Sequence, residues 1–409
     1  MKGKVAITAM TIGVSAALLA ACGGGGGGGA STSSNPSSST SSPTPASTPS
    51  VKATPITVQP SSYLNKVTAA AAIGPQSLPS EVAAGNAVAF ADFFQDGTYS
   101  MVTHTCGDTN CGGNGQPGTI HFYKNVNGQW VDHTSDILSN NVGCLHPRKA
   151  IVADFNGSEK PGVFFACHGL DASPFPGEQP HLLLPQSDGT YKNITLPFTG
   201  FFHSASAADF GGKGFADIVV ADPLIAGTPY FLINNGDGTF TKSTTRLPSV
   251  IKYGTNGSQP DLTCTSNCAA QIYTTELIDF NNTGKYDLFL GGTAPDSNSG
   301  NWIPTIFKNN GDNTYSQTNV TELPYNPTYE LALDVLSVNG AVYTTNVHLN
   351  TSGPLYGFSD IEKDVGSNSS QLWVGNSNFS NGQSWINWII PYQGKIDAID
   401  STYGVSVSQ

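Results

Sequence analysis

The loop from Ala166 to His181, ACHGLDASPFPGEQPH, brings together side chains that could do acid–base chemistry. His168, Asp171 and Glu178 fall within a short span, and a histidine beside carboxyl groups can exchange protons near neutral pH. The prolines stiffen the loop, and Phe175 offers an apolar ring. No nucleophile elbow, His-Glu-x-x-His motif or paired-carboxylate signature accompanies these residues. The loop therefore predicts either a ligand-binding surface or a catalytic set made of those three residues.

Further polar residues stand where strands are expected to begin or end. The stretch Leu145-His146-Pro147-Arg148-Lys149 precedes one apolar run, and His203 holds a similar place before the next. The residues directly after five apolar runs are polar and differ every time: His104, His168, Asp222, Thr293 and Asn346. Either solvated loops or a ring of binding groups would look like this. The additional candidate ligand-binding residues are His104, His146, Arg148, Phe175, His203 and Asp222.

A repeated acidic turn organises the elements that carry these residues. Its most complete copy is LIDFNNTGKYDLFLGG at 277–292, in which polar residues separate two apolar runs. The leading aspartates of the five copies recur at intervals of 55 to 70 residues: Asp92, Asp154, Asp209, Asp279 and Asp334. A repeat period above about 40 residues predicts a propeller or an array of similar units.

Each copy carries a second signature downstream, in which an apolar strand, a Gly/Asn/Asp turn and an aromatic residue follow one another. Examples are YFLINNGDGTF at 230–240 and TIFKNNGDNTY at 305–315, and NGQSW at 381–385 could be the fifth. Glycine and asparagine tolerate the positive φ angles of hairpin turns. One repeat thus supplies two strand pairs, enough for a four-stranded blade, and very little helix is expected.

The paired motifs resemble the FG-GAP/VCBS repeats of integrin-like β-propellers. The resemblance is good over about 85–320 and poor over 325–409. It implies an all-β propeller of four-stranded blades; members of the family usually have seven. Five blades can be counted here, and a sixth could be shared between the region around 58–85 and the C-terminal AIDSTYGVSVS. We therefore expect five to seven blades.

The same resemblance implies that some acidic turns bind a structural Ca²⁺ through oxygen ligands at positions one, three, five and nine. Carried over residue by residue, the candidate ligands are Asp279, Asn281, Thr283 and Asp287 in the fourth copy, Asp92 and Asp96 in the first, and Asp154 and Asn156 in the second. In the third copy Lys213 occupies a ligand position and would itself supply the positive charge. The alternative is an Asx-type turn that caps backbone N–H groups without an ion.

The N-terminus predicts export. Residues 1–21 have a cationic start, a short apolar core and small residues before Cys22, as in a secretory signal peptide. Leu-Ala-Ala-Cys resembles the bacterial lipoprotein box, which implies a lipid on Cys22, a membrane partner and a place in the bacterial cell envelope at the outer membrane. An ordinary signal peptide with an incidental cysteine is the alternative. Residues 22–57 are rich in Gly, Ser, Thr and Pro and predict a disordered tether, followed by the propeller at 58–409.

Charge and cysteine content narrow the function. The net charge is −12, which would repel phosphate backbones and so argues against nucleic-acid binding. Six cysteines remain besides Cys22, and an exported chain favours disulfides over a zinc site. Proximity in sequence suggests the pairs Cys106–Cys111, Cys144–Cys167 and Cys264–Cys268 among several connectivities.

Together these features predict a lipid-anchored recognition protein that binds an extracellular glycan, a protein or a small ligand. A polysaccharide hydrolase or lyase with its site near 166–181 is one alternative. A scaffold protein of the cell envelope is another.

Overall fold

The computed structural model describes a large part of the chain from residue 87 onward: residues 87–107, 115–226, 228–248, 271–279, 285–293, 303–338, 340–349, 356–375, 389–392, 395–398 and 406–408. Several predictions fall outside these residues, namely the signal peptide 1–21, the tether 22–57 and the residues Cys22, Cys111, Cys264, Cys268, Asn281 and Thr283. Within the described ranges no helix has the length and hydrophobicity needed to cross a bilayer.

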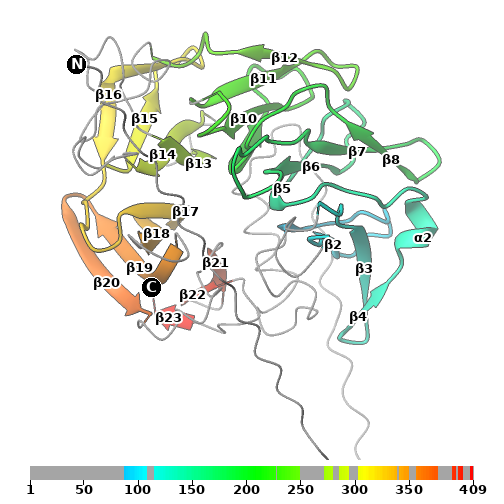
Figure 1. Cartoon of the computed structure of the whole chain (residues 1–409), viewed down its shortest axis with the longest axis horizontal. Helices are drawn as coiled ribbons and strands as arrows, with labels where there is room; N and C mark the ends of the chain where they lie inside the picture. The colour runs from blue at the N-terminus through cyan, green and yellow to red at the C-terminus, as the bar shows by residue number, and fades with distance from the viewer. Residues whose placement is uncertain are drawn as a thin grey trace, which may run out of the picture. The chain divides into compact units, whose positions relative to one another are not determined.

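The described residues form an all-β propeller with five four-stranded antiparallel blades (Figure 1), which confirms the predicted fold class. Blade 1 contains β1 (Ala87–Ala91), β2 (Ser100–His104), β3 (Ile120–Val126) and β4 (Gln129–Asp132). Blade 2 contains β5 (Pro147–Ala153), β6 (Gly162–Cys167), β7 (His181–Pro185) and β8 (Tyr191–Thr195). Blade 3 contains β9 (Ser204–Ala208), β10 (Asp217–Ala221), β11 (Tyr230–Asn234) and β12 (Phe240–Ser243).

Blades 4 and 5 follow the same order. Blade 4 contains β13 (Gln271–Ile278), β14 (Asp287–Thr293), β15 (Thr305–Asn309) and β16 (Tyr315–Glu322). Blade 5 contains β17 (Leu331–Val338), β18 (Ala341–Leu349), β19 (Tyr356–Val365) and β20 (Asn368–Val374). A three-stranded sheet comes next, formed by β21 (Ile389–Tyr392), β22 (Lys395–Ala398) and β23 (Ser406–Ser408). The single turn of helix α2 (Thr134–Ile137) agrees with the expected scarcity of helix.

The first strand of each blade lies at the propeller axis. Contacts join β1 to β5, β5 to β9, β9 to β13, β13 to β17, and β17 to β21, so that successive first strands line a central channel. Two of these strands, AVAFA in β1 and SASAA in β9, consist largely of small residues that suit the crowded axis. The outermost strands β4 and β12 are largely exposed to solvent. Residues at the start of the first strands are therefore well placed to meet at one channel mouth.

Hydrophobic cores lie between neighbouring blades. Phe93, Phe122 and Phe165 belong to the cluster shared by blades 1 and 2, and Phe231 and Phe307 to the cluster shared by blades 3 and 4. All five rings are fully buried, and each such side chain contributes about 1.5–3 kcal/mol through the hydrophobic effect. Inter-blade packing therefore fixes where one blade's loops lie relative to the next blade's.

The fifth copy of the acidic turn differs from the sequence prediction. Asp334 lies in the middle of β17, where it pairs with Thr345 of β18, and its carboxylate accepts a hydrogen bond from the backbone N–H of Ile389. The chain reverses later, at Gly340, whose φ of 79° suits glycine. The predicted position of the turn is wrong because Asp334 stands within an apolar strand and so resembles the leading aspartate of the other copies. The turn glycine of this copy comes later in the sequence, at Gly340.

Candidate functional site

The carboxylates of the acidic turns bind backbone N–H groups. Asp92 accepts hydrogen bonds from the N–H groups of Asp96 and Gly97 at 3.0 and 2.8 Å. Asp154 accepts four, from residues 156 to 159, and Asn156 accepts one from the Ser158 hydroxyl. This is the turn-capping arrangement that needs no ion.

Lysines contact acidic residues of three turns. The Nζ atoms of Lys124, Lys213 and Lys308 lie 2.8, 2.6 and 3.1 Å from carboxylate oxygens of Asp96, Asp217 and Asp287 respectively. Lys213 thus brings a positive charge to the third turn, as its position suggested. Calcium binding in the first, second and fourth turns stays a prediction, and Asp279 of the fourth lies at the edge of its described part.

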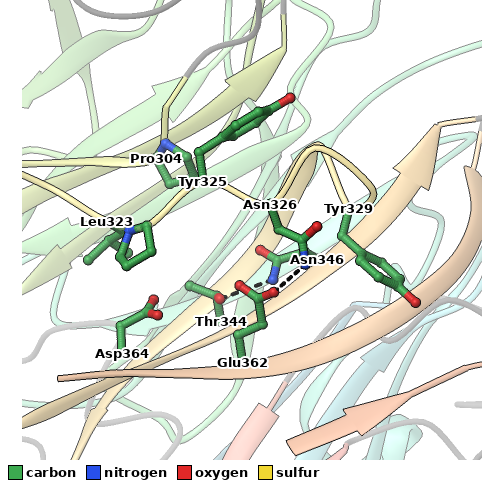
Figure 2. Close-up of a pocket in the computed structure, with 10 residues that line it drawn as sticks. Pro304, Leu323, Tyr325, Asn326, Tyr329, Thr344, Asn346, Glu362 and Asp364 are labelled. Carbon is green, nitrogen blue, oxygen red and sulfur yellow. Dashed lines mark hydrogen bonds between the residues drawn. The ribbon is translucent and has the colours of Figure 1, made fainter. Parts of the chain in front are cut away.

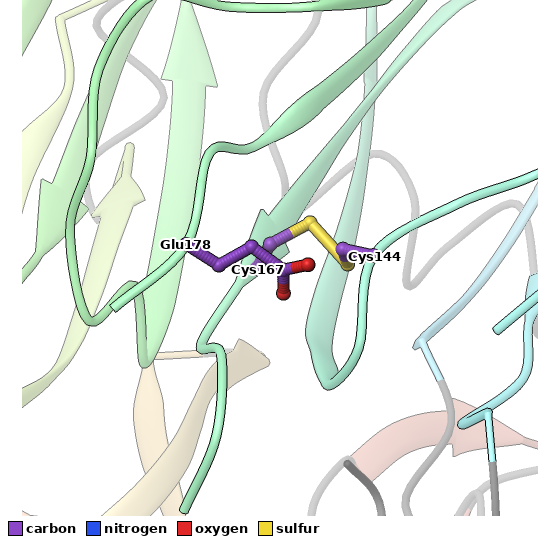
Figure 3. Close-up of side chains that lie close together, drawn as sticks. All are labelled: Cys144, Cys167 and Glu178. Carbon is purple, nitrogen blue, oxygen red and sulfur yellow. A yellow bond between two sulfur atoms is a disulfide. The ribbon is translucent and has the colours of Figure 1, made fainter. Parts of the chain in front are cut away.

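A disulfide joins blades 1 and 2, with Glu178 beside it (Figure 3). Cys144 and Cys167 form the predicted pair, with their Cα atoms 6.1 Å apart. Both carboxylate oxygens of Glu178 accept from the Leu145 N–H at 2.8 and 2.9 Å. Burial raises the pKa of Glu178 to about 6 although backbone N–H groups lower it. Glu178 therefore holds the chain just before His146.

His104 and Asp222 serve as buried anchors rather than exposed ligand groups. Nε2 of His104 accepts the N–H of Cys144 at 2.9 Å, and burial lowers the pKa of His104 to about 3. Asp222 accepts from the N–H groups of Phe201 and Ile225 at 3.0 and 3.1 Å, and burial raises its pKa. Both side chains position loops next to the channel mouth.

Four other predicted residues meet at the mouth of the channel. Arg148 at the start of β5 donates from Nη2 to Nε2 of His203, 2.9 Å away, and its Nη1 lies 3.5 Å from Nε2 of His146. The ring centre of His168 is 4.7 Å from that of His146 and 5.7 Å from that of His203. We call the set His146, Arg148, His168 and His203, together with Asp171, the arginine–histidine cluster.

Two tyrosines complete the cluster. The Tyr356 hydroxyl lies 2.7 Å from Nε2 of His203, and the Tyr356 ring lies 5.8 Å from the guanidinium carbon of Arg148. Because Nε2 of His203 accepts from Arg148, its Nδ1 carries the proton and donates to the Tyr273 carbonyl oxygen at 3.0 Å. These hydrogen bonds fix both the tautomer and the orientation of the His203 ring.

Arg148 brings a positive charge to the cluster. Burial, followed by the charge of Arg148, lowers the pKa of His168 and of His203 well below the ordinary value, so both rings are neutral at pH 7. Burial raises the pKa of Asp171 while Arg148 lowers it. None of the ion pairs found among the described residues includes Arg148. Partly buried guanidinium groups are normally paired, so this one favours an anionic ligand.

A metal ion fits this cluster less well. One ligand atom each from His146, His168 and Asp171 lies within 4.8 Å of the others, a composition that can hold a transition metal. However, the Arg148 guanidinium lies 3.5 Å from Nε2 of His146 and would repel a cation there. The arrangement therefore suits an anion better than a metal.

Phe175 adds an apolar wall near the cluster. Its side chain is 36% exposed, and its ring centre lies 5.9 Å from that of Phe201. Sequence reasoning had selected Phe175 but missed the two tyrosines, which read as ordinary strand residues. The only signal of the two tyrosines in the sequence is their place near the start of a strand. Lys149 belongs to the stretch 145–149 already noted in the sequence, and its Nζ lies 3.0 Å from Oε1 of Glu276 in β13.

Comparisons with known proteins give structural likenesses only. No protein-family model and no curated protein matches the chain. A GH43 α-L-arabinofuranosidase from Clostridium thermocellum aligns at 11% identity and a TM-score of 0.37, covering 67% of this chain and 91% of that one. A GH43 β-1,3-galactosidase aligns at 12% identity and a TM-score of 0.35, covering 80% of this chain and 94% of that one. The Vibrio cholerae biofilm matrix protein Bap1 aligns at 14% identity and a TM-score of 0.36, covering 75% of this chain and 41% of that one. Likenesses of this size concern the fold and not the activity.

Proposed function

We propose that this propeller cleaves an acidic polysaccharide by elimination, at the arginine–histidine cluster. The observation that carries the proposal is Arg148, a partly buried cation at the channel mouth that no carboxylate of the described residues pairs with. A uronic-acid carboxylate is the matching ligand, because a guanidinium binds a carboxylate through parallel hydrogen bonds.

Arg148 is held ready for such a ligand. Its hydrogen bond to His203 is to a neutral imidazole, so it orients the guanidinium without cancelling its charge. The Phe175 ring offers a face against which a sugar ring can pack. A carboxylate bound to Arg148 would thus have its pyranose ring beside both the histidines and the aromatic side chains.

The residues around Arg148 can supply the proton transfers of elimination. A base removes the proton from the carbon that bears the carboxylate, the electron pair forms a carbon–carbon double bond, and the glycosidic oxygen leaves with a proton. His168 is neutral and can accept the first proton. Burial raises the pKa of the Tyr356 hydroxyl, which therefore remains protonated and can donate to the leaving oxygen. Arg148 stabilises the charge that develops on the carboxylate during the reaction.

Elimination is favoured over hydrolysis by the position of Glu178. Glycoside hydrolysis commonly uses two carboxyl groups on either side of the bond. Of the two in the 166–181 loop, Asp171 belongs to the cluster, whereas both oxygens of Glu178 accept the Leu145 N–H beside the disulfide. Recognition without turnover would use the same Arg148 contacts and is the second candidate function.

The test is to incubate the purified protein with polysaccharides that contain uronic acids and with neutral ones. Elimination produces an unsaturated sugar that absorbs in the ultraviolet, and we expect this signal from acidic substrates only. Arg148→Met and His168→Ala should abolish it, while His133→Ala, on the surface of blade 1, should not. New reducing ends without absorbance would indicate a hydrolase, and saturable binding without products a recognition protein. No binding and no products would refute the proposal.

We also propose the finer assignments that stand beyond the fold itself. The blades are FG-GAP/VCBS repeats, supported by the turn at Asp154 and the hairpin turn at Asn234 to Gly238. Cys22 carries a lipid that anchors the protein at the outer membrane, which mass spectrometry of the mature N-terminus and fractionation of Cys22→Ser would test.

A further inference from the structure

Three carboxylic acids project from one face of β19. Asp360, Glu362 and Asp364 alternate along the strand, and alternate strand residues point to the same side. They are 0%, 5% and 3% exposed respectively. Buried acids normally have a cationic or hydrogen-bonding partner, so the surroundings of each one matter.

Two of the three acids line a small, partly open space between blades 4 and 5 (Figure 2). The space has a volume of about 10 Å³, which is room for roughly one water-sized species, and the segment that follows β16 covers it through Leu323, Tyr325 and Asn326. Glu362 and Asp364 line it from blade 5 together with Thr344. The oxygens of these side chains therefore share one compartment.

The hydrogen bonds around the acids leave one oxygen unsatisfied. Asp360 accepts from the side-chain amides of Asn346 and Gln371 at 2.9 and 2.7 Å. Glu362 accepts from the Asn326 amide at 2.6 Å. Oδ1 of Asp364, in contrast, is buried without a hydrogen-bond partner among the described residues, and it belongs to a side chain that lines the space. An unsatisfied buried carboxylate oxygen, on a side chain that lines a small space, points to a bound species.

Among the described residues, no lysine or arginine forms an ion pair with this group of acids. The lysine and arginine ion pairs of the described residues all involve other carboxylates. The Ser369 hydroxyl donates to the Asp364 carboxylate, but it adds no positive charge. Buried acids without a cationic partner are unfavourable where they stand, and a bound cation would relieve them.

We propose that this space binds a divalent cation, Ca²⁺, through the carboxylates of Glu362 and Asp364. The Thr344 hydroxyl, which accepts from the Asn346 amide at 3.1 Å, supplies a further oxygen, and water completes the coordination. All of the candidate ligands are oxygens, which suits Ca²⁺ and disfavours zinc or copper. The ion would pin the 323–326 segment of blade 4 to blade 5, and this site is separate from the acidic turns.

The test compares calcium binding to the full chain and to single variants after removal of metal by a chelator. Calorimetric titration should give a dissociation constant on the order of 10⁻⁴–10⁻³ M, as in extracellular modules. Asp364→Asn and Glu362→Gln should each remove one calcium equivalent. Two control variants should keep the calcium equivalent that the blade 5 site binds. They are Asp312→Asn, which changes an exposed residue of a hairpin turn, and Asp279→Asn, which changes the fourth acidic turn.

A second readout uses Tb³⁺, an ion that replaces Ca²⁺ and emits when a nearby tyrosine is excited. Tyr325 lines the space, so Tyr325→Phe should lower the Tb³⁺ emission and leave calcium binding intact. In chelator, Asp364→Asn should raise the melting temperature, because the unsatisfied charge is gone, and lose the further rise that Ca²⁺ gives the parent protein. Unchanged calcium stoichiometry in both acid variants would overturn the proposal.

Discussion

Replacing Lys149 with methionine should destabilise the propeller strongly. Nζ of Lys149 in β5 lies 3.0 Å from Oε1 of Glu276 in β13, and β9 separates these two first strands around the axis. The pair therefore links two first strands that are not neighbours in the propeller. The Glu276 side chain is 1% exposed and that of Lys149 16% exposed. Methionine keeps most of the lysine stem but removes the charge.

The size of the effect follows from the unequal burial of the two partners. Removing one member of a buried ion pair typically costs about 3–5 kcal/mol, because the remaining charge stays in a medium of low dielectric constant. Lys149→Met leaves the more buried charge behind, so we expect about 3–5 kcal/mol. Glu276→Gln leaves an ammonium group that can turn toward water, so its cost should be smaller, about 1–2 kcal/mol.

Urea unfolding followed by circular dichroism measures these free energies, with the double variant Lys149→Met/Glu276→Gln closing the cycle. We expect the double change to cost less than the sum of the single changes, with a coupling energy of about 1–3 kcal/mol. Exposed Lys192→Met is the matched control and should cost about 0.5 kcal/mol or less. A cost below about 1 kcal/mol for Lys149→Met, or a larger cost for Glu276→Gln, would refute the reasoning, because the pair would then behave as an exposed one.

Three further changes test other parts of the fold. Replacing both Cys144 and Cys167 by alanine should lower the free energy of unfolding in urea by about 3 kcal/mol, since the two cysteines lie 23 residues apart. Turnover should also fall, because the disulfide holds the chain on both sides of the cluster. Retained activity would contradict this. Asp154→Ala should lower the free energy of unfolding by about 2–4 kcal/mol, and by more than Asp209→Ala does. The reason is that Asp154 accepts hydrogen bonds from four backbone N–H groups and Asp209 from two. Equal melting temperatures of the two variants would contradict this. Burial and a neighbouring carboxylate raise the pKa of Asp360 from 3.8 to about 8, so the folded state holds the proton more tightly than the unfolded state. The stability of the protein in chelator should therefore fall as the pH rises between these two values. Asp360→Asn should flatten this pH dependence of the melting temperature.

The blades were predictable because their signals are local and repeated. The turn from Asp154 to Gly157 and the hairpin turn from Asn234 to Gly238 use backbone conformations that few residues adopt, so the sequence marks them clearly. Blade 5 shows the limit of prediction from these local signals. Its first two strands meet in a short turn at Gly340, and Asp334 within β17 imitates the acidic turn at the wrong place. The blade was counted correctly although its turn was misplaced.

The cluster was only partly predictable because it depends on contacts between blades. Histidine and arginine are rare enough in this chain to attract notice, and His146, Arg148, His168 and His203 do come together. Tyr356 joins them from blade 5, far away in the sequence, and nothing near it marks a site. Glu178 illustrates the opposite error, because sequence proximity to His168 suggested a shared chemistry, whereas its carboxylate holds the Leu145 backbone.

Acidic residues in this protein do three different things, and their surroundings decide which. In the turns, Asp92 and Asp154 face backbone N–H groups, so the polypeptide itself satisfies their charge. Between two first strands, Glu276 faces a lysine. In blade 5, Asp364 lines a small space with no base and no donor to Oδ1 among the described residues. Only in the last arrangement does a buried carboxylate oxygen lack a hydrogen-bond or ion-pair partner among the described residues. Charged side chains without an opposite charge beside them therefore indicate Asp364 as the place for a cation and Arg148 as the place for an anion. The acidic motif that is most conspicuous in the sequence is a weaker guide to ligands.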